Sequence, residues 1–94
     1  MTAVFTLSDY GRAFATRERG AELRDGLLER YPGAVEVVID LAGVANFSYS
    51  FADEFFGKLA GEKGVKVVVK NGSSRLDAIL TRAVATRDGC AVSA

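Results

Sequence analysis

The residues that could do chemistry gather in one short stretch of the chain, NFSYSFADEFF at residues 46–56. Two serines stand there close to two adjacent acids, Asp53 and Glu54, among several aromatic side chains. A serine near a helix start can cap the helix or carry a phosphate, and paired carboxylates can act as general acid and base. The stretch is therefore either a regulatory or catalytic site, or only the capped first turns of a helix.

The rest of the chain offers little further chemistry. Histidine, the most common general base and zinc ligand, is absent. Cys90 is the single cysteine, so we expect neither a disulfide nor a cysteine-based metal cluster. Asp40 could converge with Asp53 and Glu54, but acids at helix starts more often stabilise the helix terminus than act on a substrate. We therefore expect no enzymatic activity, no metal and no cofactor.

Length and charge restrict the class of protein further. The 94 residues suffice for one small domain, residues 1–94, and 49% of them are hydrophobic. Twelve basic and twelve acidic side chains cancel without clustering, so we expect no nucleic-acid partner. The first residues lack a secretory pattern, and the longest uncharged stretch, residues 41–52, is shorter than the ~20 residues of a membrane helix. We expect a cytoplasmic domain that does not bind a membrane.

The elements that must position these residues alternate along the chain. Apolar runs predict strands at residues 4–7, 34–44 and 64–71, with a short return strand at residues 12–15. Helical periodicity predicts helices at residues 17–31, 50–61 and 75–87. This order predicts an α/β domain with a mixed sheet of four to five strands and about three helices.

Three polar side chains stand where they could cap these helices: Thr16, Ser50 and Ser74. Gly20 lies on the apolar side of the first helix, where we expect it to allow close packing on the sheet. Phe55, Phe56 and Leu59 fall on one stripe of the second helix and are expected to be core.

The segment VVIDLAGVANFSYSFADEF, residues 37–55, resembles the core motif of the STAS domain, named for sulfate transporters and anti-sigma factor antagonists. Asp40, Gly43, Val44 and Ser50 match that motif in type and spacing. The resemblance is closer to a branch of uncharacterised bacterial STAS-like domains. Those carry a Thr-Arg pair opening the first helix, a Ser-Phe-Ala-Asp-Glu run and an Asn after the next strand, as residues 16–17, residues 50–54 and Asn71 do here.

The resemblance implies a STAS-like fold and a signalling role in bacterial transcription regulation. STAS domains are protein-interaction modules that switch partners: the domain docks on an anti-sigma factor, a histidine-kinase-like ATPase, and phosphorylation of a serine releases it. Ser50 is the candidate phosphoacceptor. Typical antagonists have Asp-Ser-Ser-Gly where this chain has Ser-Tyr-Ser-Phe at residues 48–51, which puts the switch in doubt more than the fold.

The residues alone favour a cap at Ser50 over a switch. Asp53 and Glu54 occupy the same helical turn, so a phosphate on Ser50 is expected to meet repulsion from two carboxylates. Arg17 or Lys58 could offset part of that repulsion.

Binding sites of open α/β sheets usually lie beyond the carboxyl ends of the strands. The expected partner-binding residues at that edge are Phe47, Tyr49, Ser50, Asp53 and Glu54, supported by Asp40, Gly43, Asn71 and Arg17. Phe47 and Tyr49 would suit an exposed aromatic hot spot. Arg17 opposes the dipole of its helix, which predicts an acidic partner, either Asp40 or Glu54.

One alternative function stays open, a sensor that binds a nucleotide or lipid at the same edge. The segment NGSS at residues 71–74 is too short for a phosphate-binding loop and lacks the lysine that follows one. The sequence predicts neither the oligomeric state nor the identity of the partner.

Overall fold

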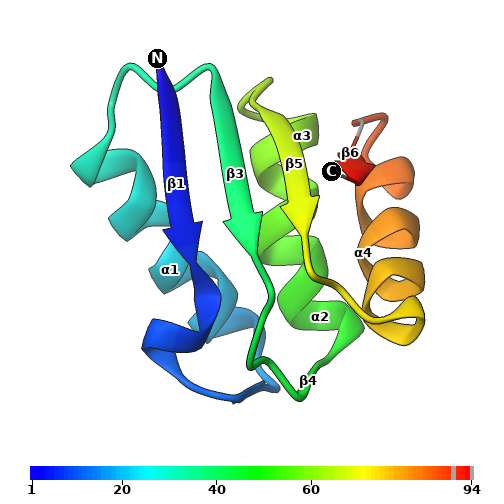
Figure 1. Ribbon diagram of the computed structural model, residues 1–94. Coiled ribbons are helices and arrows are strands. Elements are labelled where there is room, and N and C mark those ends of the chain that lie inside the picture. The colour runs from blue at the N-terminus through cyan, green and yellow to red at the C-terminus, as the bar shows by residue number, and fades with distance from the viewer. Residues whose placement is uncertain (90, 94) are drawn as a thin grey trace.

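The computed structural model describes residues 1–89 and 91–93, so Cys90 lies outside the described residues. Its main sheet has four strands, which run side by side in the order β1, β3, β5, β6 (Figure 1). Their bounds are β1 Thr2–Thr6, β3 Glu36–Asp40, β5 Lys66–Lys70 and β6 Ala91–Ser93. All pairs in this sheet are parallel.

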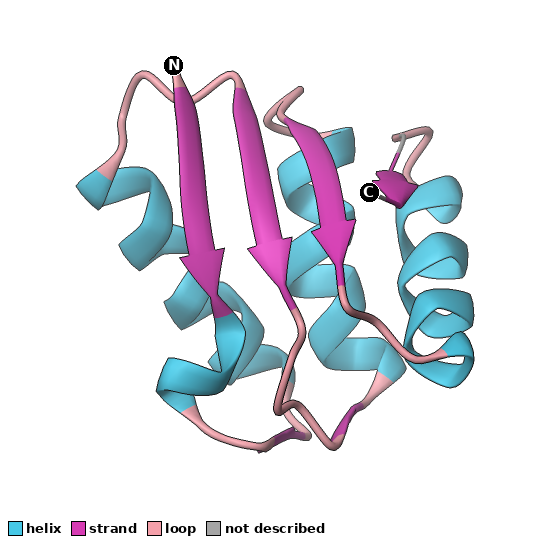
Figure 2. Cartoon of the chain, in the orientation of Figure 1, coloured by secondary structure: helices cyan, strands magenta, loops and turns pink. Residues whose placement is uncertain are grey.

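The helices lie together on one face of the sheet (Figure 2). Helix α1 spans Arg17–Arg30 and α4 spans Ser74–Thr86. Between them runs a continuous helix made of α2 (Tyr49–Ala52), the π-helical η2 (Asp53–Gly57) and α3 (Lys58–Gly61). We call these three segments the central helix. A 3-10 helix, η1 (Leu7–Tyr10), follows β1. The predicted α/β class with three main helices is confirmed.

Alternation along the strands explains why the helices bind one face only. In β3, Val37 and Ile39 are fully buried while the residues between them are partly exposed. The same period of two appears in β1 and β5, and the buried set faces the helices. There it packs on Phe55 and Phe56, which have no exposed surface, as their helical stripe predicted.

The expected return strand does not pair with β1. Instead β2 (Ala13–Phe14) pairs in parallel with β4 (Asn46–Phe47), far away in the sequence. The ring of Phe14 packs 5.0 Å from that of Phe51 on the central helix. Burial of Phe14 against this helix therefore holds the segment below the sheet edge, where it cannot run back along β1.

Two of the three predicted caps are displaced. Thr16 does cap α1, because its side chain accepts a hydrogen bond from the Arg19 amide. The central helix, however, is capped by Ser48, and α4 is capped by Ser73. Both residues have extended backbone, as a capping residue requires, whereas Ser50 already lies within the first helical turn.

Candidate functional site

The predicted supporting loop forms at the carboxyl ends of β3 and β5. Asp40 Oδ1 accepts hydrogen bonds from the Asn71 side chain and from the Ala42 amide, both at 2.9 Å. The Asn71 bond and then the Ala42 bond hold the pKa of Asp40 below its ordinary value. Asp40 thus connects the two loops that follow β3 and β5.

Two residues of these loops have left-handed backbone. Gly43 has φ 84° and Asn71 has φ 58°, conformations that glycine and asparagine adopt most readily. A side chain at Gly43 would also press on Ser8, whose Cβ lies 3.3 Å from the position of an added Cβ. The backbone at the strand ends therefore requires the residue types that the motif provides.

The adjacent acids of the opening stretch are buried. Asp53 and Glu54 are only 7% and 6% exposed, and all five residues of the π-helical segment are buried. This segment packs against α1 on one side and α4 on the other. Carboxylates in such a position need partners with opposite charge, because an unpaired buried charge is costly.

Asp53 finds its partners on α1 and at the end of α4. Arg87 donates to both of its oxygens, from Nε at 2.6 Å and from Nη2 at 2.9 Å. Arg17 Nη1 donates to Oδ2 at 2.7 Å. These bonds, with the Arg87 bonds as the largest cause, lower the pKa of Asp53 to about 2.

Glu54 is held by three cations. Arg24 Nη1 donates to Oε2 at 2.7 Å, Lys58 Nζ lies 2.9 Å from Oε1, and Arg17 Nη1 donates to Oε1 at 3.3 Å. Burial would raise the pKa of Glu54, but these bonds outweigh it and lower the pKa to about 2. The acidic partner predicted for Arg17 is thus Glu54 together with Asp53, and not Asp40.

These six side chains form one ion network, which we call the acid network: Arg17, Arg24, Asp53, Glu54, Lys58 and Arg87. It requires the helices to approach closely at Gly20, where an added Cβ would stand 2.9 Å from the Glu54 Cβ and from the Phe51 carbonyl oxygen. Gly20 therefore serves close packing, but against the central helix and not against the sheet.

The network changes what the two acids can do. Both stay ionised at neutral pH, and their oxygens already accept hydrogen bonds from cations. Asp53 and Glu54 therefore hold three helices together, and their side chains are buried where the sequence-based interpretation placed them on a binding surface.

The expected aromatic hot spot is divided between core and surface. Phe47 is buried, with its ring 5.3 Å from that of Phe56, so its assignment to an exposed surface is wrong. Tyr49 is partly exposed: its hydroxyl donates to Thr86 Oγ1 at 3.3 Å, and Arg82 lies over its ring at 5.1 Å. Only Tyr49 of this pair can reach a partner.

The two serines of the stretch have different environments. Ser48 Oγ accepts from the Phe51 amide at 3.0 Å and donates to the Ala15 carbonyl at 2.9 Å. Ser50 is partly exposed, and among the described residues no hydrogen bond engages its hydroxyl. The cap function expected of Ser50 thus belongs to Ser48.

A family comparison agrees with this geometry. Residues 19–76, more than half of the chain, match the model of the family described as STAS-like domain of unknown function (DUF4325). The chain belongs to this family. The matched segment runs from the first turn of α1 to the first turn of α4 and includes Ser50 and both buried acids. No curated protein and no solved structure matches the chain significantly.

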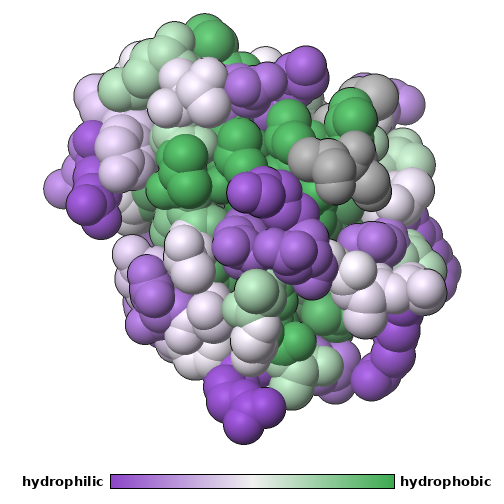
Figure 3. Space-filling model, viewed as in Figure 1, coloured by the Kyte–Doolittle hydropathy of each residue, from purple (hydrophilic) through white to green (hydrophobic). Residues whose placement is uncertain are grey.

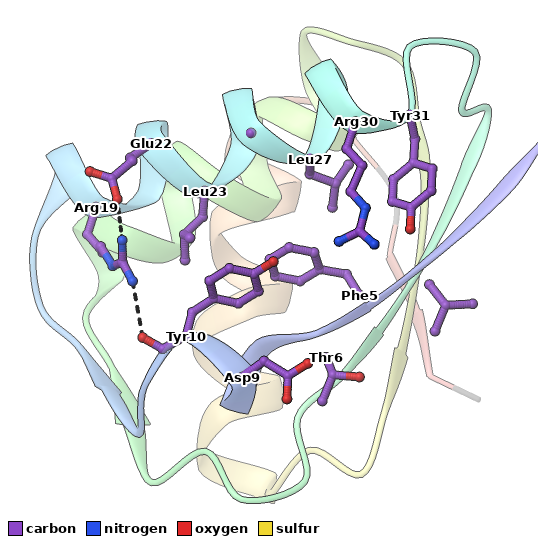
Figure 4. Close-up of a pocket in the computed structure, with 12 residues that line it drawn as sticks. Phe5, Thr6, Asp9, Tyr10, Arg19, Glu22, Leu23, Leu27, Arg30 and Tyr31 are labelled. Atoms are coloured by element: carbon purple, nitrogen blue, oxygen red, sulfur yellow. Dashed lines mark hydrogen bonds and ion pairs between the residues drawn. The ribbon is translucent and has the colours of Figure 1, made fainter.

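The STAS-like domain also has a cavity that the sequence did not predict (Figure 4). It has a volume of about 430 Å³ and lies between β1 and α1. Leu23 and Leu27 line it from the helix, and the Tyr10 ring stacks on Phe5 with centroids 4.9 Å apart. Arg30 lies at one end of the cavity (Figure 4).

None of the predicted site residues lines this cavity. The sequence contains one sign of this cavity, a glycine within the first helix, Gly26. In the structure an added Cβ at Gly26 would meet nothing within 4 Å. A glycine inside a helix that serves no close contact leaves open space at the helix surface, but spacing alone does not distinguish it from Gly20.

No group of three or more potential metal-ligating side chains occurs in the described part of the STAS-like domain. Within the same residues, no helix combines the length and apolar character needed to cross a bilayer.

Proposed function

We propose that this STAS-like domain is a non-enzymatic protein-interaction module that works by partner switching in bacterial transcription regulation. Its partner is a histidine-kinase-like ATPase of the anti-sigma factor type, and both act in the cytoplasm. Phosphorylation of Ser50 releases the partner. The partner class comes from the resemblance to anti-sigma factor antagonists, and the site of regulation from the geometry around Ser50.

The proposal rests on the different roles of two serines, Ser48 and Ser50. Ser48 caps the central helix, and Ser50 is a partly exposed residue of the first turn whose hydroxyl makes no hydrogen bond among the described residues. A kinase needs an accessible hydroxyl. A phosphate near a helix start also meets free amide groups and the positive end of the helix dipole.

The charges around this turn also permit a phosphate. The sequence argued for repulsion from Asp53 and Glu54, but both carboxylates are neutralised by Arg17, Arg24, Lys58 and Arg87. Asp25 also pairs with Arg24 and Glu62 with Arg87, so the four cations of the acid network are balanced by four carboxylates in all. A phosphate at Ser50 therefore approaches two neutralised acids and not a pair of bare ones.

The proposed docking surface surrounds Ser50 at the strand-end edge. It consists of Tyr49, Ser50 and the loops that contain Asp40, Gly43 and Asn71. Tyr49 offers a ring and a hydroxyl at the edge of the surface, which suits an interface residue. A phosphate placed at the centre of such a surface would repel an acidic partner and block close approach.

The absence of catalysis is part of the proposal. General acid–base catalysis needs a carboxyl whose pKa lies near the working pH and whose proton can reach a substrate. The pKa values of Asp53 and Glu54 are lowered to about 2, and both side chains are buried. The acids are suited to holding helices together.

Affinity purification from the source cells with three baits tests the proposal. Wild type and Ser50→Ala should capture the same ATPase, whereas Ser50→Glu should lose most of it, because a negative charge then occupies the surface. Ser48→Glu is not a suitable mimic of a phosphate in this stretch, because the substitution removes the hydroxyl that caps the central helix. Equal capture by all three baits would refute a switch at Ser50.

The cavity beside α1 supports a second candidate, the small-molecule sensor. Its volume falls in the range of ligand sites, about 300–1,000 Å³, and it combines an apolar floor with two arginines, Arg19 and Arg30, and two acids, Asp9 and Glu22. An anionic lipid or nucleotide with a flat apolar part matches this lining. It would bind away from the strand-end edge that the sequence suggested.

The variant Gly26→Leu tests this second candidate, because the new side chain would fill the cavity from a helix position that has room for it. Fatty acids and nucleotides should raise the melting temperature of the wild type and not of Gly26→Leu. Gly26→Ala, which leaves most of the volume open, is the matched control. Stabilisation of all three proteins, or of none, would exclude ligand binding in this cavity.

A further inference from the structure

One face of the main sheet carries no helix among the described residues (Figure 1). Four valines cross this face in a single row, because Val4 pairs with Val38, Val38 with Val68 and Val68 with Val92. Val4 and Val92 are 64% and 47% exposed. Apolar surface over the sheet is visible from this side in Figure 3. We call these four residues the valine row.

Charged residues stand on both sides of the valine row, sorted by strand. On β3, Val38 lies between Glu36 and Asp40, which point to the same face because the side-chain period of a strand is two. On β5, Val68 lies between Lys66 and Lys70 in the same way. The register places Glu36 level with Lys66 and Asp40 level with Lys70. The open face thus has an acidic strand beside a basic strand.

This pattern is complementary to itself under one rotation. A two-fold axis that runs along the strands, midway between β3 and β5, places β3 of one copy over β5 of the other. Glu36 then faces Lys66 and Asp40 faces Lys70, each pair twice, and Val38 faces Val68. The same axis brings β1 over β6, so that Val4 faces Val92. All four valines and all four charges find a matching partner.

We propose that the open face binds a second copy of this chain, sheet on sheet, with the two sets of strands roughly parallel. Sheets in such sandwiches stand about 10 Å apart, a spacing that valines facing one another and long charged side chains can span. A two-fold axis across the strands would instead place β3 over β3 and bring Glu36 against Asp40. Like charges facing across an interface oppose that arrangement. This inference goes beyond the proposed function and does not depend on it.

The size of the face sets the strength of the expected dimer. Three strands of five residues and one of three, about 4.8 Å apart and at about 3.3 Å per residue, cover roughly 300 Å² per copy before side chains are counted. Interfaces of this size are small and belong to weak or transient complexes. The dimer should therefore populate only from tens of micromolar to about 1 mM protein.

Sedimentation equilibrium of the whole chain over that concentration range tests the proposal. Wild type should dimerise. The variant Lys66→Glu/Lys70→Glu makes the face acidic throughout and should weaken the dimer at least about tenfold. The matched control, Lys63→Glu/Arg75→Glu, changes the net charge equally at exposed positions outside the described strands and should dimerise like the wild type. Circular dichroism confirms that each variant is folded.

A mixing experiment assigns the orientation. Glu36→Lys places positive charges side by side and should also weaken its own dimer. An equimolar mixture of this variant with Lys66→Glu/Lys70→Glu should form a heterodimer stronger than either homodimer, because an acid then faces a base in three of the four facing charge pairs, against two pairs in the Glu36→Lys homodimer and none in the other. A wild type that stays monomeric throughout overturns the proposal. So does a control that weakens the dimer as much as the face variant does, or a mixture that shows no rescue.

Discussion

Arg87 and Asp53 form a bidentate ion pair between the end of α4 and the central helix, with N–O distances of 2.6 and 2.9 Å. The two residues are 34 positions apart in the sequence. Asp53→Asn should reduce the free energy of unfolding by about 1–3 kcal/mol, because the buried Asp53 side chain would lose its charge-assisted bonds to Arg87 and Arg17. Urea titration monitored by circular dichroism measures this loss.

An exposed ion pair provides the control for that variant. Glu22 pairs with Arg19 on the surface of α1, where solvent screens both charges. Glu22→Gln should change the stability by no more than about 0.5 kcal/mol. Equal losses for the two variants would mean that burial gives the acid network no special importance.

Acid should destabilise the domain through the same carboxylates. The pKa values of Asp53 and Glu54 are lowered to about 2 in the fold, from ordinary values of 3.8 and 4.5. Their contribution is thus fully present above pH 4.5 and is lost as the pH falls towards 2. Each contributes on the order of 2 kcal/mol. Urea midpoints measured between pH 7 and pH 2 should fall steeply in this window, and the fall should be shallower in Asp53→Asn.

Two glycines of α1 should respond in opposite directions to the same substitution. Gly20→Ala forces a Cβ to within 2.9 Å of the Phe51 carbonyl and should cost about 1–3 kcal/mol. Gly26→Ala meets no atom within 4 Å and should add about 0.5–1 kcal/mol through helix propensity. Thermal unfolding of both variants decides the matter, and a gain at Gly20 would show that the close helix contact is absent.

The two serines of the central helix form another matched pair. Ser48→Ala should lose about 0.5–2 kcal/mol, since the Phe51 amide loses its cap. Ser50→Ala should stay within about 0.5 kcal/mol of the wild type. If Ser50→Ala lowered the denaturant midpoint more than Ser48→Ala did, Ser50 and not Ser48 would be the capping residue.

The sequence predicted the elements well where local pattern decides them. Alternating valines in EVVID and KVVVK mark strands with one buried face, and the apolar stripe through Phe55 and Phe56 marks the core side of the central helix. The family motif also placed Asp40 and Asn71 at the carboxyl-end edge of the sheet, where their side chains form a hydrogen bond.

Only the pairing of Arg17 with an acid could be predicted of the acid network, because tertiary packing brings its other members together. Arg24 lies 30 residues from Glu54, and no local rule pairs them. The available signal was the presence of two acids inside an apolar stripe, since buried acids require cations somewhere in the fold. Phe47 was predicted to be exposed because aromatic side chains are common in binding surfaces, but Phe47 lies in the core.

Long-range packing also determines the position of the short strand predicted at residues 12–15. A turn followed by apolar residues predicts a hairpin, but the contact between Phe14 and Phe51 outweighs local pairing with β1. A strand of two residues gains little from its own ladder, so packing of a single large side chain decides its position.

The central claim is that a phosphate on Ser50 controls partner binding, and a direct affinity measurement tests it. Domain carrying phosphoserine at position 50, made by genetic incorporation, is compared with unmodified domain by calorimetric titration against the captured ATPase. The phosphorylated form should bind at least about tenfold more weakly while its melting temperature stays within a few degrees. Dissociation constants that agree within about twofold would contradict a switch at Ser50.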